Sequence, residues 1–164
     1  MDYFLTEEQM MVRELARRIA EEKIKPVREY YDESEEFPWP IVEELAKADL
    51  CGVYIPEEYG GTGGGVLELC IAVEELCKVD GGIALVLAAT ALATFPILLF
   101  GNQEQKKKYL PDIAAGKKVA AFALTEPGAG SDASAIQTTA GREGESYILS
   151  GTKCFITNGG EAQI

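Results

Sequence analysis

Two glycine-bearing stretches in the last third of the chain contain the residue types best suited to hold a cofactor. Residues 118–132 read KVAAFALTEPGAGSD, and residues 151–160 read GTKCFITNGG. In the first stretch an apolar run enters a glycine turn, whose backbone N–H groups and serine hydroxyl can bind an anion. In the second, the aromatic Phe155 is followed closely by the hydroxyl of Thr157. Together they predict a site for a flat ring that carries a phosphate tail.

Two other interpretations of the glycine turn fit the sequence less well. Residues 128–133 formally match the dinucleotide fingerprint G-x-G-x-x-A, but that motif must open a long helix. Here Ile136 and two threonines follow at once, which favours a strand, and no acidic residue stands at the expected distance. Ser131 could be a hydrolase nucleophile, yet the G-x-S-x-G elbow is missing and no histidine can act as its base.

Composition narrows the possible chemistry further. The chain has 164 residues, no histidine and a net charge of −12. Without histidine, we expect no His-containing metal site and no Ser-His or Cys-His catalysis within this chain. The net charge would repel nucleic acid and anionic membrane surfaces, so an anionic ligand must meet local donors. The four cysteines lack Cys-x-x-Cys spacing, and we expect them to be buried, reduced thiols of a cytoplasmic protein.

The first 116 residues carry the spacing of helices. A capping box at Thr6 begins a helix that Pro26 should kink or restart. Trp39 begins a second, short helix. We expect a third helix over Val66–Lys78 and a last one over Gln103–Ala115, with a proline that disturbs it. The residues of the third helix expected to face largely inward are Leu67, Cys70, Ile71, Val73 and Leu76.

The uncharged span of residues 81–100 has the length of a transmembrane helix. Against that reading, Thr90 and Thr94 are polar, and Pro96 should break the helix near its end. A helix that is apolar on all sides can equally be the central helix of a soluble bundle, and we favour that interpretation. Charged residues from Glu7 onward also argue against a secretory signal peptide.

After Gly116 the pattern changes from helical to strand-like. Short apolar or β-branched runs occur at residues 119–124, 135–140, 147–149 and 154–157, separated by polar turns. This spacing favours an antiparallel meander, and we expect that no closing strand or helix completes it.

The predicted fold class is therefore α+β. An N-terminal all-α helical bundle over residues 1–116 is followed by a truncated antiparallel β-domain over residues 117–164. We expect the chain to be a fragment of a longer protein.

Four stretches resemble the acyl-CoA dehydrogenase family. Residues 124–132 and 151–160 resemble its paired signature, residues 55–61 resemble the loop after its second helix, and residues 101–111 resemble the approach to its β-domain. Essentially the whole chain fits, in the right order. The resemblance implies a helical N-terminal domain, a middle β-domain and a C-terminal helical bundle. It also implies that FAD lies between the β-domain and that bundle, with its adenine end reaching a neighbouring subunit.

The resemblance also implies a role for individual residues. The run 122–125 would border the flavin, with the Thr125 hydroxyl at its pyrimidine edge. Gly130 and Ser131 would meet the FAD pyrophosphate, and Ser131 would also lie close to the acyl-CoA. Phe155 would pack beside the isoalloxazine, where many members have tryptophan, and the Thr157 hydroxyl would lie near flavin N5. The implied cofactor-binding set is Phe122, Ala123, Leu124, Thr125, Gly130, Ser131, Phe155, Ile156 and Thr157.

The activity that the resemblance implies is the α,β-dehydrogenation of an acyl-CoA thioester to the trans-2-enoyl-CoA. Electrons would pass from FAD to an electron-transfer flavoprotein. The family's catalytic glutamate belongs to the C-terminal bundle, so we expect no catalytic residue in this chain and interpret Glu126 as a turn carboxylate. The fragment alone should be inactive, and the full-length protein should be a tetramer or a dimer.

Three other functions remain open at the level of sequence. The chain could belong to an acyl-CoA-binding or partner-binding module that keeps the scaffold without the chemistry. It could belong to a flavin oxidase on the same scaffold, which would react rapidly with oxygen. It could also belong to a membrane protein built on residues 81–100, which would partition into detergent during extraction.

Overall fold

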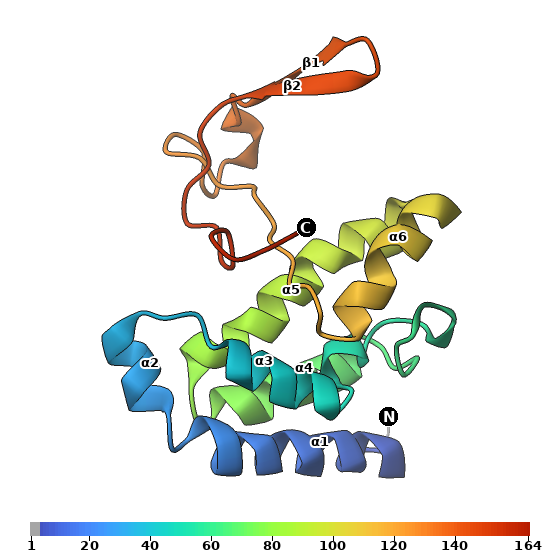
Figure 1. The fold of residues 1–164 in the computed structure, drawn as a ribbon, viewed down its shortest axis with the longest axis vertical. Coiled ribbons are helices and arrows are strands. Elements are labelled where there is room, and N and C mark those ends of the chain that lie inside the picture. The colour runs from blue at the N-terminus through green and yellow to red at the C-terminus, as the bar shows by residue number, and fades with distance from the viewer. Residues whose placement is uncertain (1–3) are drawn as a thin grey trace.

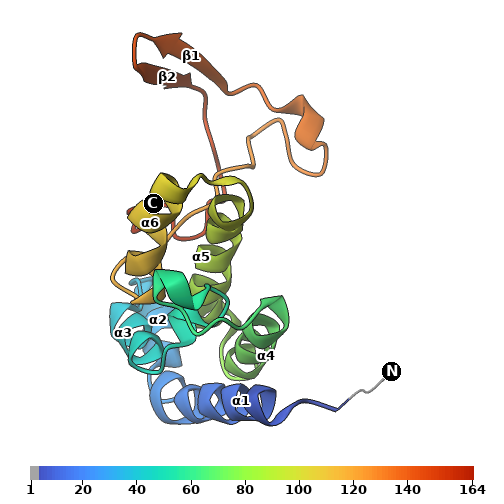
Figure 2. The same cartoon turned by 90° about the vertical axis from the view of Figure 1, so that its right-hand side faces the viewer.

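A computed structural model describes residues 4–164 and divides them into a helical body and a projecting hairpin. Figure 1 shows the helices gathered around the central α5, with the hairpin extending away from them, and Figure 2 shows the same separation after a 90° turn. The predicted α+β fold is confirmed. The elements are α1 Glu7–Ile19, α2 Arg28–Ser34, α3 Trp39–Lys47, α4 Val66–Cys77, α5 Gly81–Phe100, α6 Gln103–Ala114, β1 Thr139–Glu143 and β2 Ser146–Ser150.

Side-chain capping boxes begin the first and the last α-helix of the described residues, α1 and α6. The Thr6 hydroxyl accepts from the Gln9 N–H at 3.2 Å, and the Gln9 side chain accepts from the Thr6 N–H at 3.1 Å, which confirms the predicted capping box. Asn102 and Gln105 repeat this exchange at the start of α6. At its other end α1 continues as a π-helical turn, and α2 begins only after Pro26, so the predicted restart is also confirmed.

Neither proline inside a helix ends it. α5 continues through Pro96 to Phe100, and α6 continues through Pro111 to Ala114, so the predicted break and disturbance were wrong. Each proline removes one N–H from the helical ladder. The residues four positions earlier, Leu92 and Lys107, are exposed, so water can reach this side of each helix. Packing of the opposite faces then keeps both helices continuous.

The hydrophobic core lies where α1, α3, α4, α5 and α6 meet. Its members come from α1 and the turn that follows it, from α3 to α6, from the loop between α3 and α4, and from Ala120 after α6. Burying each large aliphatic side chain contributes about 1.5–3 kcal/mol relative to leaving it in water. The large apolar side chains with less than 2 % exposure are Ile24, Leu45, Leu50, Ile55, Leu76, Leu110 and Ile113.

The inward face of α4 differs from the predicted one. Ile71 and Leu76 are buried as expected, but Leu67 and Cys70 are exposed. Glu75 is buried instead, because Arg17 of α1 donates to both of its carboxylate oxygens, at 3.1 and 3.2 Å. This bidentate bond, together with Lys78, lowers the pKa of Glu75 against the opposing effect of burial. A charge pair that joins two helices therefore contributes to a face of α4 that was predicted to be apolar.

The cysteines are free thiols, as predicted, but they are not all buried. Cys51 is buried, and desolvation raises its pKa to about 12. Cys70 and Cys77 lie on the exposed side of α4, and Cys154 is partly exposed. The prediction of four buried thiols was wrong for α4 because its apolar pattern extends around the helix, while only one face meets α1 and α5.

Helix α5 is buried along one side only. Within the described residues, it alone is long and apolar enough to meet the length and composition criteria for crossing a membrane. Ile83, Leu87 and Thr94 face the core, whereas Leu92 and Leu99 are more than half exposed. The helix therefore occupies the central position that was predicted, but it is not enclosed on all sides.

Only part of the predicted meander is present among residues 117–164. β1 and β2 pair antiparallel with Thr139 opposite Ser150, which confirms the strand at 147–149. The runs 119–124 and 154–157 are not strands. Only the end of the run 135–140, residues 139–140, lies in β1, and a 3₁₀ turn ends at Ala135. The physical reason is that the two runs make only isolated main-chain bonds within residues 4–164, such as Cys154 N–H to Thr125 O, rather than a ladder.

A buried amide joins this region to the helical body. The side-chain N–H₂ group of Asn158 donates to the Val86 carbonyl at 3.2 Å, to the Thr90 hydroxyl at 3.2 Å and to the Ala120 carbonyl at 3.1 Å. Asn158 is 9 % exposed and has a φ of 65°, in the left-handed region that asparagine adopts more readily than most residues. One side chain thus holds helix α5, the chain leaving α6 and the 151–160 stretch together.

Removing this amide should destabilise the protein measurably. We expect Asn158→Ala to lower the free energy of unfolding by about 2–4 kcal/mol, because it leaves the buried Ala120 carbonyl without its donor and places alanine where asparagine adopts positive φ more readily. Asn158→Gly keeps the backbone conformation accessible, so it should recover about 1 kcal/mol of that loss. Urea unfolding of the three proteins measures both differences. Equal stability of Asn158→Ala and wild type would contradict this role.

Candidate functional site

The structure brings the two predicted cofactor-binding stretches side by side. We call residues 122–126 the first segment and residues 151–157 the second segment. The Cys154 N–H donates to the Thr125 carbonyl at 3.0 Å, and the Lys153 ammonium donates to the Leu124 carbonyl at 2.8 Å. The segments therefore lie together although Glu126 and Lys153 are 27 positions apart along the chain.

Apolar side chains of these segments are exposed rather than packed. Phe122 is 38 % exposed, Leu124 is 41 % exposed and Phe155 is 93 % exposed. Phe155 also has a φ of 55°, which is unfavourable for a bulky residue by about 1–2 kcal/mol. An exposed aromatic ring on a strained backbone is not explained by core packing, and strained residues of this kind are frequent at ligand-binding sites.

Backbone donors are available along the first segment and the glycine turn. Within residues 4–164, no carbonyl or side chain accepts a hydrogen bond from the N–H groups of Ala123, Leu124, Thr125, Gly130 or Ser131. The carbonyls of Leu124 and Thr125, in contrast, are both engaged. These N–H groups are therefore available as donors to an acceptor-rich, anionic partner.

The glycine turn is closed by a pair of main-chain bonds. Glu126 N–H donates to Ala129 O at 3.0 Å, and Ala129 N–H donates to Glu126 O at 3.1 Å. A Cβ added at Gly128 or Gly130 would meet no atom within 4 Å, and neither glycine has positive φ. The fold of residues 4–164 therefore does not itself require glycine here. The open space beside both positions suits close approach of a phosphate group to the backbone.

The Glu126 carboxylate collects donors from three parts of the chain. It accepts from the Lys153 ammonium at 2.8 Å, from the Gln137 N–H at 2.8 Å and from the Thr138 N–H at 3.0 Å. The Lys153 ammonium is the main reason that the pKa of Glu126 falls to about 2. A carboxylate this acidic is a poor proton acceptor at neutral pH, which agrees with its interpretation as a structural turn residue.

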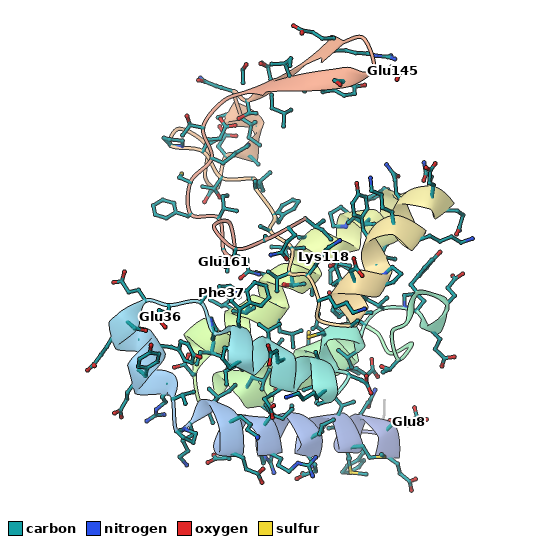
Figure 3. The ribbon with its side chains drawn as sticks, viewed as in Figure 1. Glu8, Glu36, Phe37, Lys118, Glu145 and Glu161 are labelled. Carbon is teal, nitrogen blue, oxygen red and sulfur yellow. The ribbon has the colours of Figure 1, made fainter. Side chains whose placement is uncertain are left out.

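The remaining predicted residues, Ile156 and Thr157, line an open cleft. The cleft has a volume of about 730 Å³ and lies between the second segment, α2 and the start of α5. Figure 3 shows Glu36, Phe37 and Glu161 at this place, and each of them lines the cleft. Because carboxylates dominate its charged lining, a phosphate is better accommodated at the glycine turn than here.

Sequence reasoning missed the two side chains that build the site. Lys153 and Asn158 both stand within the recognised motif, but no role was predicted for either. Lys153 follows Gly151 closely, and a Cβ at Gly151 would collide with the side chain of Thr138. That close approach explains why residue 151 is glycine. A glycine in this motif is therefore a sequence signal that the second segment passes close to another part of the chain, here Thr138.

The low pKa of Glu126 makes its contribution to stability depend on pH. In the unfolded chain a glutamate has a pKa of about 4.3. The ionised Glu126 therefore stabilises the folded state fully above that pH, and this stabilisation is lost as the pH falls toward 2. We expect Glu126→Gln to be less stable than wild type at pH 6, and the difference to shrink by pH 2.5. Urea unfolding at both pH values measures this.

The matched control for that experiment is Glu145→Gln. Glu145 lies in the exposed hairpin turn, away from the helical body (Figure 3), and its replacement should leave the stability unchanged at pH 6. A stability difference between Glu126→Gln and wild type that is the same at pH 6 and pH 2.5 would contradict the assignment of the low pKa.

Comparison with known proteins identifies the family. The model of the acyl-CoA dehydrogenase N-terminal domain matches residues 6–117, and that of the middle domain matches residues 121–164. A short-chain specific acyl-CoA dehydrogenase of Clostridium acetobutylicum is 47 % identical over 163 residues, 99 % of this chain and 43 % of the relative. An acryloyl-CoA reductase (NADH) of Anaerotignum propionicum is 45 % identical over 166 residues, covering 100 % of this chain and 42 % of the relative.

Solved structures agree with the relatives. Butyryl-CoA dehydrogenase from Megasphaera elsdenii has a TM-score of 0.92 at 42 % identity, covering 99 % of this chain and 44 % of that chain. A chain from the study of the electron transferring flavoprotein of Acidaminococcus fermentans has a TM-score of 0.94 at 49 % identity, covering 99 % of this chain and 43 % of that chain. Acyl-CoA dehydrogenase from Bacillus anthracis, complexed with FAD, has a TM-score of 0.86 at 39 % identity, covering 93 % of this chain and 27 % of that chain.

The extent of these matches defines what the chain represents. It spans less than half the length of the curated relatives it matches. Helix α5 lies wholly within the part matched by the N-terminal domain, and both segments of the site lie within the part matched by the middle domain. The resemblance of the two glycine motifs is therefore confirmed, and the chain belongs to the acyl-CoA dehydrogenase family.

Proposed function

We propose that the complete protein containing this chain catalyses the FAD-dependent α,β-dehydrogenation of an acyl-CoA thioester to the trans-2-enoyl-CoA. The observation that carries the proposal is the row of unpaired backbone N–H groups on the first segment and glycine turn, beside the exposed ring of Phe155. A flavin with a pyrophosphate tail has an acceptor-rich edge, a flat face and two anionic groups, which match these three features.

Each group of residues in the site would contact a different portion of the cofactor. The N–H groups of the first segment and the Thr125 hydroxyl would hold the pyrimidine edge, and Gly130 and Ser131 would hold the pyrophosphate. Phe155 would cover one face of the ring, with Ile156 beside it and the Thr157 hydroxyl toward the reacting side. When bound, FAD supplies the acceptor for the substrate hydride. The base that removes the α-proton would come from outside these residues.

The partners follow from the same proposal. The complete protein would bind an acyl-CoA near Ser131 and pass electrons to an electron-transfer flavoprotein. The structural likeness to a chain studied with the electron transferring flavoprotein of Acidaminococcus fermentans supports that acceptor. A homo-oligomer would cover apolar side chains such as Leu99 and Phe100, which are 68 % and 84 % exposed. The free thiols suit a reducing, cytoplasmic location.

Reduction of an α,β-unsaturated acyl-CoA is a second candidate. It is favoured by the 45 % identity to the acryloyl-CoA reductase of Anaerotignum propionicum. The same residues would hold the flavin, which would supply a hydride to the enoyl-CoA, with NADH as the two-electron reductant that the name of that relative gives.

Anaerobic absorbance spectroscopy of the full-length protein tests both candidates. We expect a bound-flavin band that bleaches when a saturated acyl-CoA of suitable chain length is added, because hydride transfer reduces the flavin. Adding the electron-transfer flavoprotein should restore the band. A band that saturated acyl-CoAs leave intact, but that enoyl-CoAs restore after chemical reduction, would favour the reductase. A purified protein that neither contains nor binds flavin would contradict the proposal.

A further inference from the structure

The side chain of Lys153 lies between the two segments and bonds to two residues of the first segment, Leu124 and Glu126. Its ammonium donates to the Leu124 carbonyl and to the Glu126 carboxylate, each at 2.8 Å. We propose that Lys153, held by Glu126, is a positioning residue that turns the Thr125 N–H outward as a hydrogen-bond donor to the bound flavin. The inference rests on the proposed function, because it names how the flavin edge is presented.

The geometry of the peptide unit links the two atoms. The Leu124 carbonyl and the Thr125 N–H belong to one planar peptide group, and the described residues contain no cis peptide bond. In a trans peptide the C=O and the N–H point in opposite directions. When the Lys153 ammonium holds the carbonyl, the N–H of the same peptide must point away from that ammonium. Within residues 4–164, no other group bonds to this peptide.

The neighbouring peptide is fixed by different means, which isolates the role of Lys153. Between Thr125 and Glu126, the carbonyl accepts from the Cys154 N–H, and the N–H donates to the Ala129 carbonyl. That peptide would keep its orientation without Lys153. The peptide between Leu124 and Thr125 would lose its one bond and could rotate, and Thr125 N–H would no longer be preorganised.

Glu126 fixes Lys153 in turn. Two backbone N–H groups, from Gln137 and Thr138, hold the carboxylate in place, so the ammonium meets an anchored anion. The side chains of Lys153 and Glu126 are 24 % and 7 % exposed. Partial removal from water strengthens this pair relative to the surface pair Lys47–Glu44, in which the lysine side chain is 67 % exposed. The low pKa of Glu126 agrees with a pair that remains ionised at neutral pH.

Titration of the full-length apoprotein with FAD tests the inference. Lys153→Met keeps the aliphatic stem but removes both donor bonds, so we expect the Kd for FAD to rise about tenfold. We also expect the visible absorbance spectrum of the bound flavin to shift, since a hydrogen bond at its pyrimidine edge is lost. Lys153→Arg keeps a cation with several donors and should stay within about threefold of the wild-type Kd.

Matched variants separate positioning from general destabilisation. Lys47→Met removes an exposed lysine of the same size from a carboxylate pair on α3, and it should change neither the Kd nor the spectrum. Glu126→Gln removes the anchor of Lys153 and should weaken FAD binding in the same direction as Lys153→Met. If circular dichroism shows that Lys153→Met does not fold, the Kd of Glu126→Gln for FAD tests the role of Lys153 instead. A wild-type Kd for folded Glu126→Gln would then overturn that role.

Each outcome bears on a different claim. Wild-type protein that binds no FAD would overturn both the proposed function and the role of Lys153. Wild-type protein that binds FAD, together with a folded Lys153→Met that has the same Kd and the same spectrum, would overturn the role of Lys153 alone. Weakened binding with a shifted spectrum, reversed by arginine and absent in Lys47→Met, would support it.

Discussion

The architecture depends on one buried amide, that of Asn158. It donates to a helix carbonyl at Val86, to the Thr90 hydroxyl and to a carbonyl of the chain that leaves α6. Buried acceptors that lose their donor cost about 1–3 kcal/mol, so this contact strongly favours a single arrangement of the helical body and the second segment. It lies directly beside Thr157, and therefore the same contact that joins the two regions also places one edge of the candidate cofactor site.

Side-chain bonds replace a strand ladder across residues 117–164. The hairpin β1–β2 is the sheet found among the described residues, and the extended runs on either side of it are joined by Lys153, Glu126 and a few main-chain bonds. A regular ladder would engage N–H and C=O groups alternately along an extended segment. Here the carbonyls of Leu124 and Thr125 are engaged, while the N–H groups of Ala123, Leu124 and Thr125 donate to no partner within residues 4–164. That asymmetry is what makes the segment suitable for binding an acceptor-rich cofactor.

The net charge of −12 on these 164 residues favours this arrangement. A protein with such an excess of carboxylates repels phosphate groups at long range, so binding must come from short-range donors. The backbone N–H groups of the glycine turn provide these donors without adding a positive side chain. Among residues 4–164, the cation that lies between the two segments is Lys153, and Glu126 neutralises it. Its charge therefore serves the geometry of the site, and in the proposed cofactor site the backbone would provide the anion contacts.

The sequence by itself determined the helices and their caps, the α+β division and the two segments of the site, because these depend on local spacing and on motifs within a few residues. It did not determine which face of α4 is buried, that Pro96 and Pro111 are tolerated, or that runs 119–124 and 154–157 lack strand partners. Those features depend on which elements pack together. The roles of Lys153 and Asn158 were decided only by tertiary structure, since their partners lie 27 to 72 positions away along the chain. A hydrogen bond depends on distance in space, and the folded chain alone sets that distance.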